Sequence, residues 1–460
     1  MQNVFVFNPL AEGYIARGKA FAPVRAQAML AEDLAGLPQF LCAPDDIVLL
    51  TKRPLAGFLR GLAQAGFRTP EFVELKAGRV DPAGSLCYRK LGGLRPWAWG
   101  PDSIELLEPL FAQLVGEART AIQCFNAGIA RLYSKGWSAG FLRSVLARSR
   151  GGHSSPSRGG KVQGQLGASV AEPWLCSEQE AGVVADTLEG ALEAIAAIRG
   201  RGHHRVVIKE AHGVAGHNAI RLWEPEILPA QRRWLPRALG DGQQVVVEPW
   251  LERELDFSVQ LEMGPRGLQL CGYTGLINDR RGQFLANWAE PDYSGCLPAQ
   301  VAALFGAPAD LSGHLQRFYG DVFSLLEAEL QRVGFVGPIS IDAFVYRAAG
   351  GGCRLKPVVE INPRYTMGRL TVELMQHALP GSCGLFRLVN KAQARAEGFA
   401  DLASYASSLR ARLPLRLERG SSPRIRRGAL CLNDPGQARV CLATFEVGPT
   451  LNLPRSLIGN

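Results

Sequence analysis

Two carboxylates and one amide stand in two strand-like segments that are joined by a run of glycines. Asp342 belongs to the first segment, whose β-branched and aromatic residues predict a strand, and Glu360 and Asn362 belong to the second. The glycines between them predict a turn, and a hairpin centred on Gly351 places Asp342 opposite Glu360. Asn362 then shares the face of Glu360, because side chains along a strand repeat every two residues. The sequence therefore predicts three oxygen-bearing side chains close together.

Opposed carboxylates on a hairpin need something between them. At about 5 Å they repel by roughly 1 to 3 kcal/mol, whereas a favourable cross-strand pair contributes only about 0.2–1 kcal/mol. A divalent cation would resolve the repulsion, and two carboxylates with one amide suit Mg²⁺, which keeps its other positions for water and substrate phosphates. The alternative is a pair of solvated carboxylates that salt screens.

A second candidate element is a lysine at the end of a short apolar strand. Lys209 follows Val206–Ile208 and precedes a loop that contains Gly213 and Gly216. Glycines let backbone N–H groups turn toward an anion, and the lysine adds a point charge, so the pattern predicts a phosphate-binding hairpin. The alternative is an ordinary hairpin turn with a solvated lysine.

A third element is an apolar strand, residues 245–247, that runs into a segment rich in acids. Glu248, Leu251 and Glu254 follow it, with Asp256 close behind. Such a crossover can offer backbone hydrogen bonds to a purine edge and a carboxylate to a ribose diol. The alternative is that these acids are only solvated, as most charged residues are.

The pattern of strand-like and helical segments that must position these groups predicts an α/β (α+β) fold. The first 125 residues alternate short apolar strands with helical segments, which is typical of a parallel sheet. A Gly/Ser/basic stretch at 151–169 predicts a flexible surface insertion, and residues 259–287 predict antiparallel strands. We expect an N-terminal domain, a small lid, a larger antiparallel domain and a basic C-terminal extension, with the bounds 1–125, 126–258, 259–400 and 401–460.

Three motifs follow one another along the chain. They are Lys209 with its glycine loop, the strand that leads to Glu248 and Glu254, and Asp342 followed by Glu360-Ile-Asn362-Pro-Arg364. Together they make the chain resemble the ATP-grasp superfamily over roughly residues 126 to 375. The first 125 residues are similar to the pre-ATP-grasp domain that usually precedes it. The resemblance implies an ATP-grasp fold with a small lid and a larger antiparallel C-terminal domain.

The resemblance also implies roles for individual residues. Lys209 would bind ATP phosphates beneath a flap formed by Gly213 to Gly216, and Lys135 would be the second phosphate-contacting lysine, with Lys161 as a weaker substitute. Glu248 and the backbone near Leu251 would meet the adenine, and Glu254 the ribose, with Asp256 as its competitor. Asp342, Glu360 and Asn362 would hold Mg²⁺, and Arg364 would stabilise an acyl phosphate. For the substrate, Arg369 and Arg280 are candidates that could pair with a carboxylate.

The activity that the resemblance implies is an ATP- and Mg²⁺-dependent ligation of a carboxylate to an amine or another nucleophile, through an acyl phosphate that releases ADP and phosphate. Such a reaction needs positioning and charge neutralisation from the protein. The alternatives are a small-molecule phosphotransferase on the same fold and a nucleotide-binding scaffold without turnover. We expect small-molecule partners and no membrane or nucleic acid, with a homodimer as a candidate assembly.

The net charge, the cysteine pattern and the N-terminal sequence limit which partners and which cell compartment are expected. The net charge of +9 is compatible with an acidic ligand, although the arginines of residues 410–427 are interpreted as a solvated basic surface. The ten cysteines are scattered without a CxxC pair, which argues against a zinc site and a disulfide framework. The N-terminus lacks the pattern of a signal peptide. We therefore expect a cytoplasmic protein.

Overall fold

The computed structural model describes most of the chain, including every element discussed below. The described residues are 1–18, 21–116, 119–150, 172–213, 219–279, 282–305, 310–418, 420 and 423–450. The insertion predicted at 151–169, with Lys161, lies outside the described residues, as do Gly216 and Arg280.

The N-terminal domain is built on a parallel four-stranded sheet in the order β3-β2-β1-β4. Its strands are β1 (Gln2–Val6), β2 (Ile47–Leu50), β3 (Glu71–Glu74) and β4 (Leu91–Pro96). Its helices include α1 (Ala11–Arg17), α2 (Arg25–Asp33), α3 (Ala56–Gln64) and α4 (Pro101–Leu107). Helix α4 ends at Leu107 and a 3-10 turn follows, because Pro109 has no N–H to donate.

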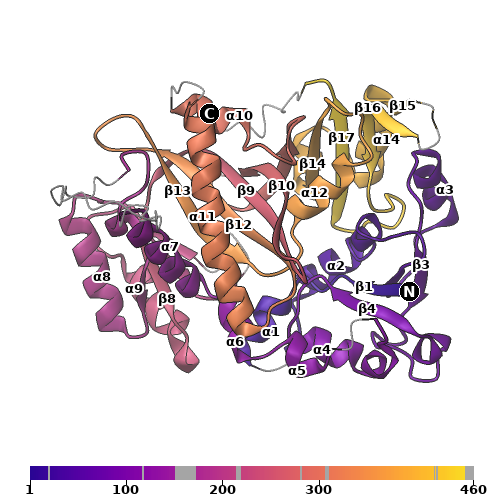
Figure 1. Cartoon of the computed structure of the whole chain (residues 1–460), viewed down its shortest axis with the longest axis horizontal. Coiled ribbons are helices and arrows are strands. Elements are labelled where there is room, and N and C mark those ends of the chain that lie inside the picture. Colours follow the sequence, from indigo (N-terminus) through magenta and orange to yellow (C-terminus); the bar gives the residue numbers. More distant parts are fainter. Residues whose placement is uncertain are drawn as a thin grey trace, which may run out of the picture.

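The lid is an antiparallel four-stranded sheet, in the order β5-β8-β6-β7, with two covering helices (Figure 1). Its strands are β5 (Val183–Ala185), β6 (Val206–Glu210), β7 (Ala219–Leu222) and β8 (Val245–Pro249). Helices α8 (Leu188–Gly200) and α9 (Pro229–Ala238) pack on it. Helix α8 begins where Thr187 caps it by accepting a hydrogen bond from the N–H of Gly190.

The largest sheet has nine antiparallel strands in the order β13-β12-β9-β10-β11-β14-β17-β16-β15. The strands are β9 (Glu252–Gly264), β10 (Gly267–Asn278), β11 (Phe284–Ala289), β12 (Gly337–Arg347), β13 (Cys353–Asn362), β14 (Cys383–Asn390), β15 (Arg416–Glu418), β16 (Arg424–Cys431) and β17 (Cys441–Gly448). The helices of this region are α7 (Lys135–Arg150), α10 (Ala299–Leu304), α11 (Asp310–Val333), α12 (Met367–Met375), α13 (Lys391–Ala396) and α14 (Leu402–Arg412), and the short α5 (Ala121–Cys124) and α6 (Ala127–Leu132) lead into α7. The expected fold class, with a parallel N-terminal domain, a small lid and a larger antiparallel domain, is confirmed.

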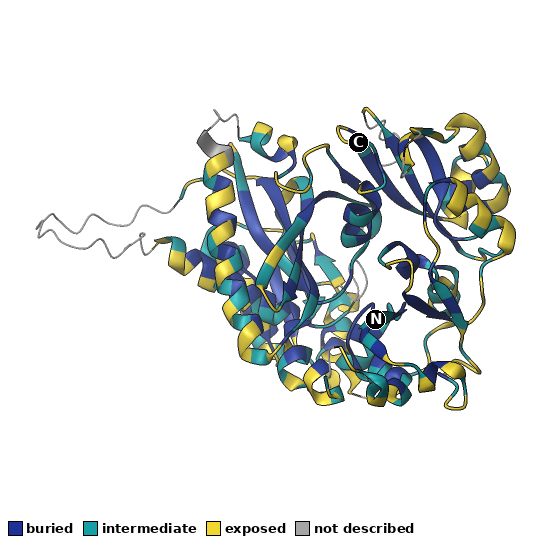
Figure 2. Ribbon diagram, turned by 45° about the vertical axis from the view of Figure 1, so that its right-hand side comes forward, coloured by how far each residue is buried: buried dark blue, intermediate teal, exposed yellow. Residues whose placement is uncertain are grey.

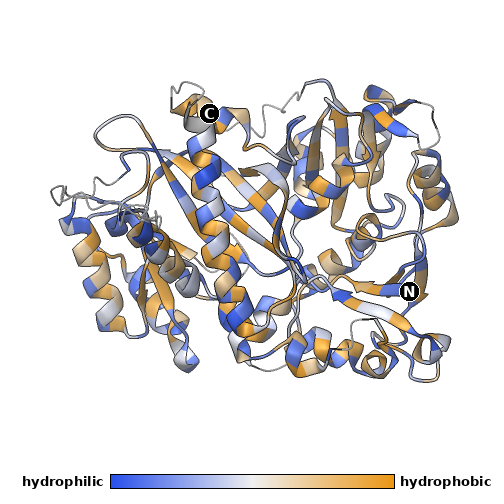
Figure 3. Cartoon of the chain, in the orientation of Figure 1, coloured by the Kyte–Doolittle hydropathy of each residue, from blue (hydrophilic) through white to orange (hydrophobic). Residues whose placement is uncertain are grey.

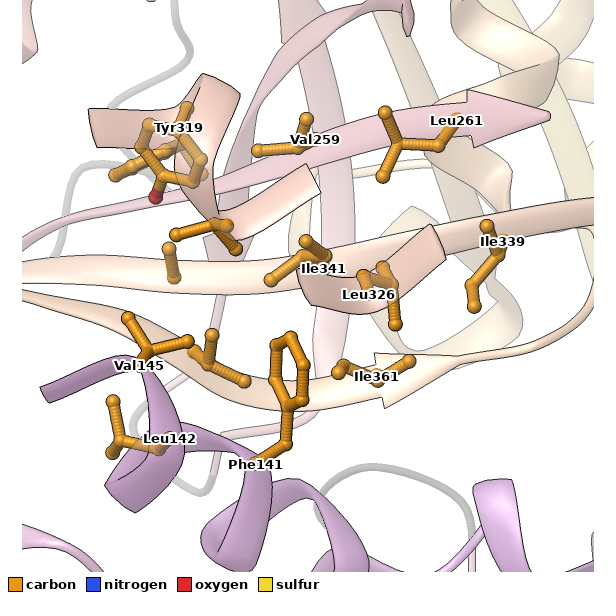
Figure 4. Packing of buried hydrophobic residues seen from close by; sticks show 14 of the residues in the cluster. Phe141, Leu142, Val145, Val259, Leu261, Tyr319, Leu326, Ile339, Ile341 and Ile361 are labelled. Carbon is orange, nitrogen blue, oxygen red and sulfur yellow. The ribbon is translucent and has the colours of Figure 1, made fainter. Parts of the chain in front are cut away.

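One face of the large sheet is covered by α7 and α11. Figure 4 shows Phe141 of α7 beside Ile361, and Leu326 of α11 over Ile341. These side chains belong to one buried hydrophobic cluster. Because side chains alternate along a strand, the residues between the apolar ones point to the opposite face, toward the lid. Figure 3 shows the same recurrence of hydrophobic residues along the strands, and Figure 2 shows that the strands are the most buried part of the molecule.

The hairpin of β12 and β13 has the predicted pairing, although its turn is placed differently. Asp342 pairs with Glu360, as the sequence predicts, but near the turn Arg347 pairs with Cys353, which centres the loop one residue earlier than Gly351. A bulge on β13 around Pro357 makes up the difference. Because the bulge inserts two residues, it leaves the faces of the strand unchanged.

Strands from the last sixty residues complete the large sheet. β17 pairs with β14, and β16 pairs with β17. The arginines at 416, 424, 426 and 427 are exposed, as expected of a solvated basic surface. The expected lid boundary at residue 258 falls inside β9, which is continuous, so the chain passes from the lid to the large sheet between β8 and β9.

Over the part of the chain that the structure describes, no helix combines the length and the apolar character needed to span a bilayer.

Candidate functional site

A cavity of about 580 Å³ lies between the lid sheet and the lid-facing side of the large sheet. Lys209 and Arg221 line it from the lid, and Asp256, Asp342 and Glu360 line it from the large sheet. The other lining residues are Lys135, Val207, Ala219, Trp250, Glu252, Arg253, Leu276, Asn278, Asp279, Gly282, Ala343, Phe344 and Val359. Its volume is within the range of small-molecule sites.

The two opposed carboxylates have different surroundings within this cavity. Asp342 accepts hydrogen bonds from Ser258 Oγ at 2.8 Å and from Asn362 Nδ2 at 3.1 Å. Burial, and next the charge of Glu360, raise the pKa of Asp342 to about 6. Lys135 Nζ lies 2.9 Å from Glu360 Oε1, and both side chains are largely buried. The repulsion expected from the sequence is therefore present in the structure.

The donor set of this acid pair fits a hard divalent cation. Across the described residues, no group of three or more His, Cys, Asp or Glu gathers at one point. The candidate ligands are instead two carboxylates and the amide of Asn362, all oxygen donors. Mg²⁺ commonly takes one or two carboxylates and completes its shell with water and phosphate oxygens, so two carboxylates are sufficient.

Lys135 enters the cavity from the first turn of α7. Besides Glu360, its ammonium donates to the carbonyl of Gly213 at 2.6 Å, and its backbone N–H donates to the carbonyl of Ala211. Burial works against the charge of Lys135, but Glu360 and Glu12 outweigh it and raise the pKa. Lys135 therefore stays cationic and ties the glycine loop to the acid pair.

Lys209 shares a buried carboxylate with a second lysine. Its Nζ lies 3.0 Å from Glu248 Oε2, and Lys356 Nζ lies 3.4 Å from the same oxygen. Burial by itself would raise the pKa of Glu248, but the two lysines outweigh it and lower it to about 2. Burial lowers the pKa of Lys209, and Glu248 restores it only in part. Glu248 does not line the cavity, so its visible role is to hold Lys209.

Arg364 is held by a carboxylate from the N-terminal domain. Its Nε lies 2.8 Å from Glu12 Oε1, and its Nη2 donates to Asn362 Oδ1 at 3.0 Å. Glu12, in the first turn of α1, is only 4% exposed. Burial opposes its ionisation, but Arg364 and then Lys135 lower its pKa. The N-terminal domain therefore helps to place the guanidinium next to the candidate metal ligands.

Replacing Glu12 by Ala should lower the free energy of unfolding by about 3 kcal/mol, because it leaves the buried Arg364 without its counter-charge. Chemical denaturation measures this. Glu252→Ala is the matched control, since its pair with Arg205 is exposed and should cost less than about 1 kcal/mol. Equal losses in the two variants would contradict the buried pair.

The raised pKa of Asp342 predicts how stability depends on pH in the metal-free protein. The pKa is higher in the folded state, so this residue stabilises the fold below pH 4, and the contribution disappears as pH rises through about 6. Two pKa units correspond to about 3 kcal/mol. Burial lowers the pKa of His212 and His377, which contribute with the opposite sign.

The measured quantity is therefore the difference in unfolding free energy between wild type and Asp342→Asn at each pH. As the pH rises from 4 to 7, the unfolding free energy of Asp342→Asn should increase by about 3 kcal/mol relative to that of the wild type. Saturating Mg²⁺ should shrink this gain. Parallel pH profiles for the two proteins would contradict the burial of an ionised Asp342.

The structure separates the two candidates for a ribose contact. Asp256 lines the cavity, where Arg253 and Asn278 hold its carboxylate. Glu254 lies outside it and pairs with Arg347 at 2.8 Å. A bulge in β9 at residue 254 puts these two acids in different positions relative to the cavity. Leu251 is buried in the hydrophobic cluster of the large sheet, next to the cavity-lining Trp250.

Arg369, one of the expected substrate arginines, does not line this cavity. Arg369 lies between two glutamates, with Nη1 2.7 Å from Glu262 and Nε 2.8 Å from Glu373. The guanidinium of Arg369 pairs with both carboxylates, so these two ion pairs are sufficient to explain the position of its side chain. Arg280, the other candidate, lies outside the described residues.

Sequence reasoning missed several residues that the fold brings to the site. Glu12 gave no signal, because it lies 352 positions from its partner. Ser258 and Gln260 form a hydrogen-bonded pair beside Asp342, and they stand at alternate positions between buried apolar residues of β9. That polar alternation could have identified them. Lys356, 1% exposed, could have been noticed as a lysine inside a strand that carries Glu360 on the same face.

Scans against protein-family models and curated proteins find no match for this chain. Among solved structures, N5-carboxyaminoimidazole synthetase from Staphylococcus aureus, complexed with ADP, is similar at 10% identity over 99% of this chain and 95% of that chain, with a TM-score of 0.47. The biotin carboxylase domain of a 2-oxoglutarate carboxylase from Hydrogenobacter thermophilus, in complex with MgADP, ADP and bicarbonate, is similar at 9% identity over 97% and 85%, with a TM-score of 0.46.

The Aspergillus clavatus N5-carboxyaminoimidazole synthase, in complex with ADP and 5-aminoimidazole ribonucleotide, is similar at 10% identity over 88% of this chain and 95% of that chain, with a TM-score of 0.42. The three sheets of this protein place a lysine-bearing lid over an acid-bearing antiparallel sheet, which is the arrangement of domains that the sequence predicted.

Proposed function

We propose that this protein is an ATP- and Mg²⁺-dependent ligase that joins a carboxylate to an amine through an acyl phosphate and releases ADP and phosphate. One observation carries the proposal: Lys209 of the lid and the opposed pair Asp342 and Glu360 line one cavity. The magnesium complex of a nucleotide polyphosphate requires cations near its phosphates and oxygen ligands for its metal ion, and the two sides of this cavity offer both.

The lysines supply positive charge from two directions. Lys209 approaches from the lid and is held by Glu248, while Lys135 approaches from α7 and is held by Glu360. Asp342, Glu360 and Asn362 would hold Mg²⁺, whose contribution when bound is to neutralise charge on the phosphates. We assign the ribose contact to Asp256 rather than Glu254, and an adenine contact to the backbone near Leu251.

Arg364 is the residue we assign to stabilisation of the acyl phosphate. Its guanidinium is fixed by Glu12 and by the side chain of Asn362, which is itself a proposed metal ligand. A cation held in advance stabilises developing charge without the cost of reorganisation during the reaction. In this arrangement Glu12 is a positioning residue, because it acts through Arg364.

The lining of the cavity favours transfer through the substrate over a covalent enzyme intermediate. None of the described residues that line it is a Ser, Thr, Cys or His. A carboxylate substrate attacks the γ-phosphorus and displaces ADP, and the amine then attacks the acyl carbon and displaces phosphate. Both steps need only positioning and charge neutralisation from the protein. Carboxylates, lysines and an arginine are sufficient for that reaction.

The test is incubation with Mg²⁺ and ATP against a panel of small carboxylic acids and amines, with ADP, phosphate and product mass measured. Formation of ADP and phosphate only when both an acid and an amine are present is the expected result, and Asp342→Asn should abolish it. AMP and pyrophosphate would overturn the proposal. ADP with a stable phosphorylated acceptor would identify a phosphotransferase, and nucleotide binding without turnover would identify a scaffold.

A further inference from the structure

A row of hydrogen bonds leads to Asp342 from the first turn of α12. The backbone N–H of Arg369 donates to Thr366 Oγ1 at 3.1 Å, and Thr366 Oγ1 donates to Gln260 Oε1 at 2.8 Å. Gln260 Nε2 donates to Ser258 Oγ at 2.8 Å, and Ser258 Oγ donates to Asp342 Oδ1 at 2.8 Å. These bonds connect the start of a helix to one oxygen of a proposed metal ligand.

The direction of the bonds is set where the row begins. A backbone N–H can only donate, so Thr366 Oγ1, which accepts from it, uses its own proton toward the carbonyl oxygen of Gln260. This turns the amide nitrogen of Gln260 toward Ser258, and it leaves the proton of Ser258 for Asp342. An ionised carboxylate can only accept, so the row ends at Asp342 with every member oriented.

The second oxygen of Asp342 is held in the same way from β13. The guanidinium of Arg364, which also can only donate, donates to Asn362 Oδ1 at 3.0 Å. The amide is thereby oriented so that Asn362 Nδ2 donates to Asp342 Oδ2 at 3.1 Å. Each oxygen of Asp342 therefore accepts from a donor whose direction is fixed, and the two bonds together fix the plane of the carboxylate.

The sheet does not by itself require such a row. Ser340 of β12 stands opposite both Gln260 and Asn362, and it is fully buried. Its hydroxyl nevertheless has no hydrogen-bond partner among the described residues. Ser258 and Gln260, 3% and 1% exposed, lie on the same face as Ser340. Their connection to Asp342 is therefore specific to these two side chains.

A glycine in α12 lets the helix come close enough to complete the row. A β-carbon on Gly368 would overlap Gln260 Nε2 and would lie 2.9 Å from Thr274 Oγ1. Because Gly368 has no side chain, Thr366 at the start of α12 can reach Gln260. The spacing between α12 and β9 therefore depends on this residue.

We infer that Ser258, Gln260 and Thr366 are positioning residues that fix the carboxylate of Asp342 for Mg²⁺ and so favour Mg²⁺ over the larger Ca²⁺. The inference rests on the proposed function, because it takes Asp342 as a metal ligand. Groups that hold a ligand from behind typically contribute about 10- to 100-fold in metal affinity. Mg²⁺ demands near-ideal octahedral geometry, whereas Ca²⁺ accepts irregular geometry, so a freely rotating carboxylate costs Mg²⁺ more.

The experiment uses the full chain without nucleotide. Electron paramagnetic resonance measures free Mn²⁺, and Mg²⁺ and Ca²⁺ are added as competitors. Ser258→Ala should raise the Kd for Mg²⁺ by about 10- to 100-fold, and the Kd for Ca²⁺ by less than about threefold. Gln260→Met should do the same, because a thioether cannot donate to Ser258. Gly368→Ala should resemble Gln260→Met, since it displaces the same amide.

Ser340→Ala is the matched control. It also removes a buried hydroxyl from this face, but that hydroxyl has no partner among the described residues, so both Kd values should stay within about twofold of wild type. Thr366→Ser keeps the hydroxyl and should keep the wild-type preference for Mg²⁺, whereas Thr366→Val should lose it. Thr366 is half-buried, so this pair decides the question if a variant nearer the core does not fold.

The outcomes separate this inference from the proposed function. If wild type binds Mn²⁺ and the variants of Ser258, Gln260 and Thr366 keep its Mg²⁺ affinity, the row serves only the fold and the inference is overturned, while the metal site stands. Equal losses for Mg²⁺ and Ca²⁺ would also overturn it, because they indicate a general loosening. If wild type does not bind Mn²⁺, or Asp342→Asn binds it equally well, the inference and the proposed function fail together.

Discussion

Glu360→Gln should reduce ADP formation by about a thousandfold, because it removes one of two carboxylates that would hold Mg²⁺ and also releases the ammonium of Lys135. Glutamine keeps the shape of the side chain, so the protein should remain folded. Loss of the opposed charge should also bring the pKa of Asp342 down toward its ordinary value, so the pH dependence of stability should weaken as well. Turnover with MgATP and denaturation at several pH values measure the two effects.

Glu252→Gln is the control for that experiment. Glu252 lines the same cavity, but its pair with Arg205 is exposed, with side chains 64% and 57% accessible. A neutral residue there should leave turnover within about threefold, since exposed pairs contribute little. If Glu360→Gln retained activity while its fold was intact, the acid pair would not be the metal site.

Lys209→Met should raise the Kd for MgATP by roughly ten- to a hundredfold, the range expected for a lost charge-assisted hydrogen bond. The fold should survive, because Glu248 keeps Lys356 as a partner at 3.4 Å. Calorimetry with Mg²⁺ and ATP measures the affinity. Because burial already lowers the pKa of Lys209, wild-type affinity should also fall at alkaline pH earlier than for an ordinary lysine.

Arg205→Met tests whether any cation on the lid would give the same result. Arg205 immediately precedes β6, the strand that carries Lys209, but it lies outside the cavity and pairs with Glu252. Its replacement should change the Kd for MgATP less than about threefold. Equal effects of the two substitutions would indicate a general electrostatic attraction in place of a specific phosphate contact.

The pairing of Asp342 with Glu360 could be predicted from the sequence because it depends on local rules. Glycines set a turn, and a two-residue period assigns the faces of both strands. The turn itself was predicted one residue late, and the bulge near Pro357 compensated for this without moving the acids to the other face. The position of Lys209 could be predicted from the sequence equally well, since a strand end and a glycine loop are local signals.

Other parts of the site depend on where distant segments pack. The positions of Glu254 and Asp256 relative to the cavity follow from a bulge in β9 that no residue type marks. Arg369 pairs with Glu262 and Glu373, and none of these three residues lines the cavity. The partnership of Lys135 with Glu360 needed α7 to dock beside β13.

Periodicity, turn residues and charge, which act over a few positions, therefore determined the strands, their faces and the chemical character of the cleft. Tertiary packing alone decided that Glu12 fixes Arg364 and that two lysines share Glu248, because these contacts join residues separated by tens to hundreds of positions. Burial raised their importance, since removing water strengthens each such charge pair and penalises each unpaired group.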